Sequence, residues 1–414
     1  MNLFRTSFYS GISQAVNIIT GLLAVKIIAG RIGPEGVALQ GQYLNSISII
    51  SIFASGSITI GVIKYLAEYY NDKERQLRVI RTALAITIMC CLLTATVCIL
   101  LAKPLAVQAF KDEEYTSVYW LFGLFLPLTA LNGLFSATLN GLKKIPYLTL
   151  VNIIISIVNV ISLLILSKYF GVYGVLIAAN FVNLIVFIIH LVLLNKYKWF
   201  SIQSLQPIWD KEISIKLFKF SLMSLMAGFI VPLAQMFIRN KLIDSFGFNA
   251  AGQWQTVTRI SEFYLSFVIA VLSVYYLPKL SELQEKSDIK REIYSTLKFV
   301  LPIVILIAFS IWFARDMIIR YLLTDKFLAT RNLFHFQLIG DVFKIVGWML
   351  SYILWAKAMT RKYLIIDGLS FFMYIIASII CINYFGLIGA TIGFCVTYII
   401  YFITMAIVNR KYLF

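Results

Sequence analysis

Long apolar runs separated by short polar segments make up most of the chain. A helix needs about 20 apolar residues to cross about 30 Å of hydrocarbon, and runs of that length recur from one end of the sequence to the other. They predict an all-α, polytopic membrane protein with about twelve transmembrane helices. The predicted spans are residues 6–30, 42–65, 79–102, 118–141, 147–167, 172–195, 217–238, 252–277, 296–314, 333–356, 363–382 and 386–408.

The composition supports lipid as the solvent of this chain. Of its 414 residues, 60% are hydrophobic and 13% are charged, and the mean hydropathy is +0.87, which is more apolar surface than a water-soluble core hides. The first run carries Gln14, Asn17 and Lys26, and no small-residue cleavage site follows it. We therefore expect it to remain as the first helix and not to be a cleaved signal.

The basic residues indicate an orientation in the membrane. The formal charge is +17, and in a soluble protein such an excess would raise the question of nucleic acid. Here the basic residues flank the apolar runs, and about two-thirds of them fall on the cytoplasmic side if the N-terminus is inside. The sequence thus predicts two cytoplasmic termini, contact with anionic membrane lipids, and no nucleic-acid partner.

The chain contains an internal repeat. Tyr169-Phe-Gly-Val-Tyr-Gly174 returns as Tyr384-Phe-Gly-Leu-Ile-Gly389, and Lys196-Tyr197 returns as Lys411-Tyr412 at the same spacing. The repeat predicts two six-helix lobes, residues 1–210 and 211–414. Because six is even, the lobes enter the membrane in the same orientation, and we expect substrate between them. Gly174 and Gly389 are predicted to be points of close helix packing, since glycine allows backbones to approach.

Sequence signals for catalysis are absent. No Gly-x-x-x-x-Gly-Lys-Ser/Thr loop is present to cradle ATP phosphates, the two histidines lie in separate spans, and the five cysteines lack metal-site spacing. We expect no catalytic residues, no metal and no cofactor. The alternative of a membrane glycosyltransferase or polymerase is disfavoured by the short outer loops.

Two carboxylates stand near the middle of the predicted membrane. Glu262 and Asp341 each lie about 15 Å into their spans, with Arg259 and Lys344 three residues away on the same helical face. Ionisable residues at this depth mark functional sites. Lining of a polar cavity, with Glu262 and Asp341 in ion or proton coupling, is one interpretation; two self-neutralised pairs that only join helices are the other.

Lys26 and Arg239 occupy equivalent positions of the repeat, near the outer ends of the first and seventh spans. A two-lobed protein could bring these two cations towards one axis. Their long side chains could instead reach lipid head groups. Both interpretations stay open from the sequence.

Several strings resemble a known family. Arg239-Asn-Lys-Leu242, Gln253-Trp-Gln255, Ser273-Val-Tyr-Tyr-Leu-Pro-Lys-Leu-Ser281, Leu297-Lys-Phe-Val-Leu-Pro302 and the run from Arg331 to Asp341 are similar to the Wzx-type flippases. The similarity is greatest to the branch that moves the lipid-linked repeat unit of enterobacterial common antigen. These flippases belong to the multidrug/oligosaccharidyl-lipid/polysaccharide exporter (MOP) superfamily.

The resemblance implies two six-helix lobes arranged in a V, a central cationic cavity and alternating access. It implies a bacterial inner-membrane flippase that moves a polyprenyl-pyrophosphate-linked oligosaccharide from the cytoplasmic to the periplasmic leaflet, with the polysaccharide polymerase machinery as a protein partner. The glycan stays open between enterobacterial common antigen and an O-antigen unit of lipopolysaccharide. A cation-coupled exporter of drugs or small solutes is the alternative within the same fold.

The charges within the spans agree with an anionic substrate. A pyrophosphate cannot cross hydrocarbon bare, and Lys26, Arg239, Arg259 and Lys344 are the cations that could neutralise it. The predicted substrate-binding residues are these four.

Overall fold

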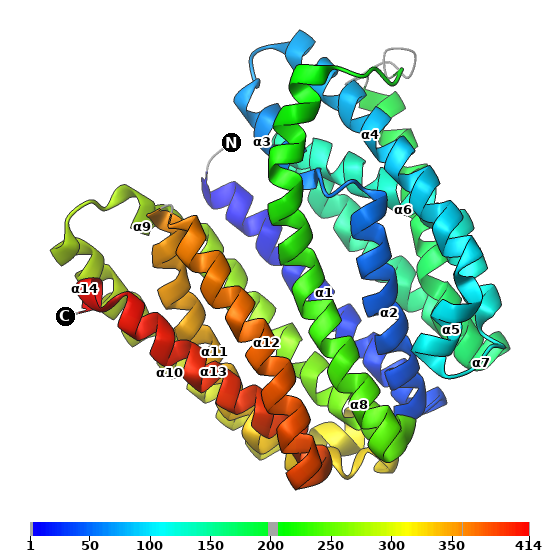
Figure 1. The fold of residues 1–414 in the computed structure, drawn as a ribbon, viewed down its shortest axis with the longest axis vertical. Helices are drawn as coiled ribbons and strands as arrows, with labels where there is room; N and C mark the ends of the chain where they lie inside the picture. The colour runs from blue at the N-terminus through cyan, green and yellow to red at the C-terminus, as the bar shows by residue number, and fades with distance from the viewer. Residues whose placement is uncertain (1–2, 198–205, 358, 414) are drawn as a thin grey trace. The chain divides into compact units, whose positions relative to one another are not determined.

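The computed structural model describes residues 3–197, 206–357 and 359–413, and within them all regular structure is helical (Figure 1). Short π-helical (η2, η3) and 3₁₀ (η4, η5) turns join some of the α-helices. In chain order the elements are α1 Leu3–Arg31, α2 Pro34–Ala54, α3 Thr59–Glu68, α4 Lys73–Leu100, α5 Ala102–Phe110, α6 Thr116–Gly141, α7 Ile145–Tyr197, α8 Lys211–Val271, η2 Leu272–Tyr276, α9 Leu277–Glu282, α10 Lys286–Met317, η3 Ile318–Leu322, η4 Asp325–Phe327, α11 Thr330–Ala356, α12 Thr360–Phe385, η5 Gly386–Ile388, α13 Gly389–Val408 and α14 Arg410–Leu413.

The helices confirm the predicted all-α membrane fold. Eight stretches of the described residues are long and apolar enough to cross a membrane, and two of them, with 49 and 48 residues, are long enough to cross twice. Helix α7 contains two predicted spans, and α8 contains the span 217–238 and most of the span 252–277, whose last residues form η2 and the start of α9. The predicted span 42–65 differs from the structure, because a turn between Ala54 and Thr59 divides it into α2 and α3.

Glycines break the long helices at equivalent places of the repeat. Gly171 inside α7 has φ 54° and Gly386 between α12 and α13 has φ 64°, while Gly33 between α1 and α2 has φ 84° and Gly247 inside α8 has φ 80°. Positive φ is available to glycine without steric cost. The two halves of the sequence thus share the positions of their backbone breaks as well as their motifs.

Gly174 and Gly389 are points of close packing, as the sequence predicts. A Cβ atom on Gly174 would lie 2.0 Å from the carbonyl oxygen of Leu166, and one on Gly389 would lie 2.1 Å from that of Cys381. In both cases the helix that follows the break starts directly against the end of the helix before it. No side chain fits at either position without movement of the backbone.

The chain divides into two compact units. Unit 1 comprises Met1–Arg31 and Leu39–Leu233, and unit 2 comprises Ile32–Ala38 and Ala234–Phe414. This division follows packing and lies inside α8, whereas the predicted lobes, 1–210 and 211–414, follow the duplicated sequence. The lobe boundary at residue 210 stays a prediction.

In unit 1, α6 lies at the centre and packs against α3, α4, α5 and α7, and α7 also packs against α1. Figure 1 shows α4 and α6 side by side. The first part of α8 joins this unit, because Leu217 contacts Gly61 and the Ser221 hydroxyl donates to the carbonyl oxygen of Gly56 at 3.0 Å.

In unit 2, α11 packs against α9, α10, α12 and α13, and α12 lies along α13 (Figure 1). Two glycines of α11 allow this contact: a Cβ on Gly340 would lie 2.6 Å from the Phe394 ring, and one on Gly347 would lie 2.7 Å from the Tyr401 ring. The aromatic side chains of α13 therefore rest directly on the backbone of α11.

We predict that Gly389→Ala lowers the free energy of unfolding by about 1–3 kcal/mol, because the new methyl group overlaps the Cys381 carbonyl. The measurement is the melting temperature of the detergent-solubilised protein. Gly368→Ala in α12 is the matched control, since nothing lies within 4 Å of a Cβ at that position. Equal melting temperatures for the two variants would contradict the close-packing assignment.

Candidate functional site

The two arms of α8, before and after Gly247, are joined by a hydrogen bond deep inside unit 2. The guanidinium of Arg239 donates to the side-chain oxygen of Gln255, and it lies 5.7 Å from the centre of the Trp254 ring. The Arg239 side chain is 0% exposed. The break at Gly247 brings these residues together, since each lies about two turns from it on its own arm.

A second hydrogen bond joins the same two arms. Gln235, one turn before Arg239, donates its amide to the Glu262 carboxylate at 2.7 Å. Arg259 lies on the same arm between Gln255 and Glu262, where it is attracted by Glu262 and repelled by Arg239. Residues spaced by three or four share one helical face, so polar side chains follow the facing sides of both arms.

Asp341 of α11 is hydrogen-bonded to α8. Its carboxylate accepts the Tyr264 hydroxyl at 2.7 Å and the Gln337 amide at 3.3 Å, and the side chain is 0% exposed. Lys344, one turn further along α11, is partly buried and is attracted electrostatically by Asp341 and by Glu262. The hydrogen bond from Tyr264 fixes the carboxylate between the two helices.

Five of the six site residues predicted from the sequence thus form one electrostatically connected set, which we call the unit 2 charge cluster: Arg239, Arg259, Glu262, Asp341 and Lys344. It contains three cations and two carboxylates. Arg239 and Asp341 are buried, Arg259 and Lys344 are half-buried and Glu262 is exposed. With all five ionised, the cluster carries an excess positive charge, and charge interactions of its buried members are stronger than in water. Such a cluster can attract and hold an anionic group.

Lys26, the sixth residue, lies on α1 in unit 1 with an exposed side chain. Its pairing with Arg239, which the repeat suggests, stays a prediction. For Arg239 itself the structure places the guanidinium inside unit 2, against Gln255 and Trp254, and a fully buried side chain does not extend to lipid head groups.

The sequence analysis missed the neutral partners of the charges, Gln235, Gln255, Tyr264 and Gln337. Their spacing carried a signal: Gln235 stands four residues from Arg239, Gln255 four from Arg259 and Gln337 four from Asp341. It also missed Asp367 of α12, whose carboxylate accepts the Tyr401 hydroxyl at 3.0 Å.

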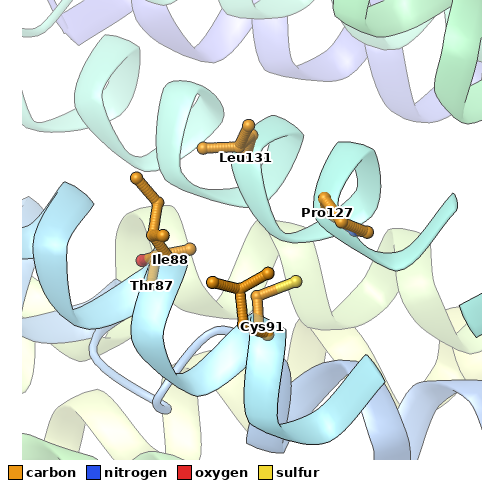
Figure 2. A pocket seen from close by; sticks show the side chains of 6 residues that line it. Thr87, Ile88, Cys91, Pro127 and Leu131 are labelled. Atoms are coloured by element: carbon orange, nitrogen blue, oxygen red, sulfur yellow. The ribbon is translucent and has the colours of Figure 1, made fainter. Parts of the chain in front are cut away.

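A separate hollow on unit 1 has a different character. It measures about 260 Å³ and lies between α4 and α6, lined by Thr87, Ile88, Cys91, Leu92, Pro127 and Leu131 (Figure 2). Its lining is almost wholly apolar, and none of the predicted site residues contributes to it. Ile88 and Leu92 are exposed, as expected for a surface that faces hydrocarbon.

The fold is that of MOP superfamily transporters. The chain is similar to an inward-facing structure of a multidrug resistance MATE family transporter, with a TM-score of 0.80, 16% identity and 97% of each chain covered. It is also similar to a MOP superfamily transporter from Pyrococcus furiosus, described as having a reversed polarity of its binding pocket, with a TM-score of 0.71, 14% identity, and 100% of this chain and 97% of that one covered.

The sequence defines the family more closely. A model of the family described as polysaccharide biosynthesis protein matches residues 3–284. Two proteins named lipid III flippase, from Escherichia coli strain K12 and from Shigella flexneri, are each 33% identical to this chain over 402 residues, with 97% of both chains covered. The chain belongs to this polysaccharide biosynthesis family, which confirms the family resemblance inferred from its motifs.

We predict that Gln255→Leu lowers the free energy of unfolding by about 1.5–3 kcal/mol, because the buried Arg239 guanidinium loses an acceptor. The double variant Arg239→Met/Gln255→Leu should recover part of that loss, since two apolar side chains leave no uncompensated charge. Thermal melting in detergent compares the wild type, the two single variants Gln255→Leu and Arg239→Met, and the double variant. A double variant that equals the sum of the single effects would show that the two side chains do not interact.

Proposed function

We propose that this protein is a flippase that moves a polyprenyl-pyrophosphate-linked oligosaccharide from the cytoplasmic to the periplasmic leaflet of a bacterial inner membrane. The observation that carries the proposal is the unit 2 charge cluster: three cations and two carboxylates of the membrane-spanning helices lie together, with Arg239 and Asp341 fully buried, Arg259 and Lys344 half-buried and Glu262 exposed. Buried charge is costly in a membrane protein and marks a substrate or ion pathway. The full-length relatives named lipid III flippase support the lipid-linked substrate.

The electrostatics favour an anionic head group over the cationic drugs of the alternative. Arg239 contacts a neutral amide and an aromatic ring and is attracted by Glu262, and the cluster as a whole contains one more cation than carboxylates. A pyrophosphate offers charged acceptor oxygens, which form the strong hydrogen bonds that a guanidinium prefers. The prenyl tail can stay in lipid while the head group moves.

The mechanism we propose is alternating exposure of the cationic site to the two sides of the membrane. Both termini are cytoplasmic in this scheme, and the protein catalyses no covalent step. The polysaccharide polymerase machinery receives the flipped unit on the outer side.

The direct test is reconstitution into liposomes with a defined polyprenyl-pyrophosphate glycan in one leaflet and measurement of its movement to the other. Transfer faster than in protein-free liposomes supports the proposal. Movement of an organic cation without movement of the glycan lipid would favour the drug exporter instead.

Lys26 and Arg239 are proposed to bind the pyrophosphate. We expect Lys26→Gln and Arg239→Gln each to reduce glycan flipping about tenfold or more, since each removes one charge-assisted contact. Membrane content and melting temperature of each variant are the controls for folding, and Lys241→Gln on the same helix as Arg239 is the matched control for loss of a cation. Full flipping by the double variant Lys26→Gln/Arg239→Gln would contradict the assignment.

Glu262 and Asp341 are proposed to couple transport to an ion or proton gradient. A carboxylate inside a span can alternate between a paired and a protonated state, so Glu262→Gln and Asp341→Asn should reduce gradient-dependent flipping more than they reduce binding of the glycan lipid. Flipping with and without an imposed cation gradient, together with a binding assay in detergent, separates the two effects. Unchanged gradient dependence in both variants would place coupling elsewhere.

A further inference from the structure

The ammonium group of Lys344 is surrounded by aromatic rings. Its Nζ lies 4.8 Å from the ring centre of Trp348, 5.1 Å from that of Tyr398 and 5.5 Å from that of Phe394. A cation within about 6 Å of a ring face is attracted by the electrons of that face. Three rings at once make a cage, and we call Trp348, Phe394 and Tyr398 the Lys344 cage.

The cage is built into the packing of unit 2. Trp348 stands one turn after Lys344 on α11, and Phe394 and Tyr398 stand one turn apart on α13, with ring centres 4.7 Å from each other. Phe394 presses against Gly340 of α11, where any Cβ would overlap its ring. Because α11 and α13 are in direct contact here, the rings have little freedom to move away from the ammonium.

A carboxylate completes the surroundings: Asp341 stands three residues before Lys344 on α11. Asp341 attracts Lys344 electrostatically, and its two oxygens also accept hydrogen bonds from Tyr264 and Gln337. Aromatic faces together with a nearby carboxylate are the chemistry by which proteins bind free organic ammonium ions. In this protein the ammonium group of the Lys344 side chain occupies that environment.

We propose that Lys344 is a tethered cation, whose ammonium occupies an ammonium-binding cage of unit 2 with Asp341 as counter-ion. The cage is then a latent site for a primary alkylammonium ion, closed in the native protein because its own lysine fills it. This role differs from the substrate contact that the sequence suggested for Lys344, and it does not depend on which substrate the protein carries.

The test removes the lysine and offers its head group as a free ion. Lys344→Ala is purified in detergent, and its melting temperature is measured with ethylammonium chloride and, at equal ionic strength, with sodium chloride. We expect ethylammonium to raise the melting temperature of Lys344→Ala by about 3 °C or more, because a ligand that binds only the folded state stabilises it. Wild-type protein and the control variant Lys241→Ala should show no such rise.

Three results would overturn the proposal: no response of folded Lys344→Ala to ethylammonium, an equal response to sodium, or an equal response of the wild type. Adding Phe394→Leu to Lys344→Ala should abolish most of the rise, since it removes one ring of the cage. A rise that survives this change would place the ethylammonium elsewhere.

A second measurement keeps the proposal testable if Lys344→Ala does not fold. Lys344→Met keeps the length of the side chain without its charge, and Trp348→Leu removes one cage ring. If the ring holds the ammonium, Trp348→Leu lowers the melting temperature more in the wild-type background than in Lys344→Met. Equal losses in both backgrounds would show that ring and ammonium do not interact.

Discussion

Hydrocarbon offers no hydrogen-bond partners, so every polar group within the membrane must find one inside the protein. The backbone meets this demand with long helices, and side chains meet it locally: the hydroxyls of Thr138, Thr256 and Thr397 each donate to the carbonyl four residues earlier, at 2.7–2.8 Å. Charged residues need further partners. Gln337 donates to Asp341 from the same helix, but Gln235, Gln255 and Tyr264 reach their charged partners from a second helix or a second arm of α8, which is why the charge cluster of unit 2 lies where α8 folds back and α11 packs against it.

The sequence was sufficient to predict the helices, because lipid makes apolar length a strong signal. Spans such as 118–141 and 333–356 correspond closely to α6 and α11. The hydropathy pattern did not predict the turn between α2 and α3, where Gly56 and Ser57 take positive φ, since the three residues Ser55-Gly-Ser57 are too few to interrupt the apolar runs on either side of them. Local backbone geometry leaves little trace in a hydropathy pattern.

For the candidate site, the sequence identified the charges but not the way they are satisfied. Spacing alone suggested ion pairs within one helix, Arg259 with Glu262 and Asp341 with Lys344. The structure adds partners from other segments: Glu262 accepts from Gln235, and Asp341 accepts from Tyr264. Such partners depend on how α8 turns at Gly247 and on which face of α11 packs against α8. The periodicity of a single span predicts neither of these.

Comparison of the two halves of the internal repeat distinguishes the residues that the fold requires from those found only at the candidate site. The backbone breaks are shared, with Gly33 equivalent to Gly247 and Gly171 to Gly386, and the pair Arg239 and Gln255 has its counterparts in Lys26 and Gln42. The carboxylates of the unit 2 charge cluster have no counterparts in the first half of the sequence.

At the same spacing as these counterparts, Ser46 and Ile49 stand where the second half has Arg259 and Glu262. Because the first half forms its corresponding helices without those charges, the architecture does not require them. Charges within a membrane span are costly, and Arg259 and Glu262 are charges that the fold does not need, which agrees with the functional role proposed for them.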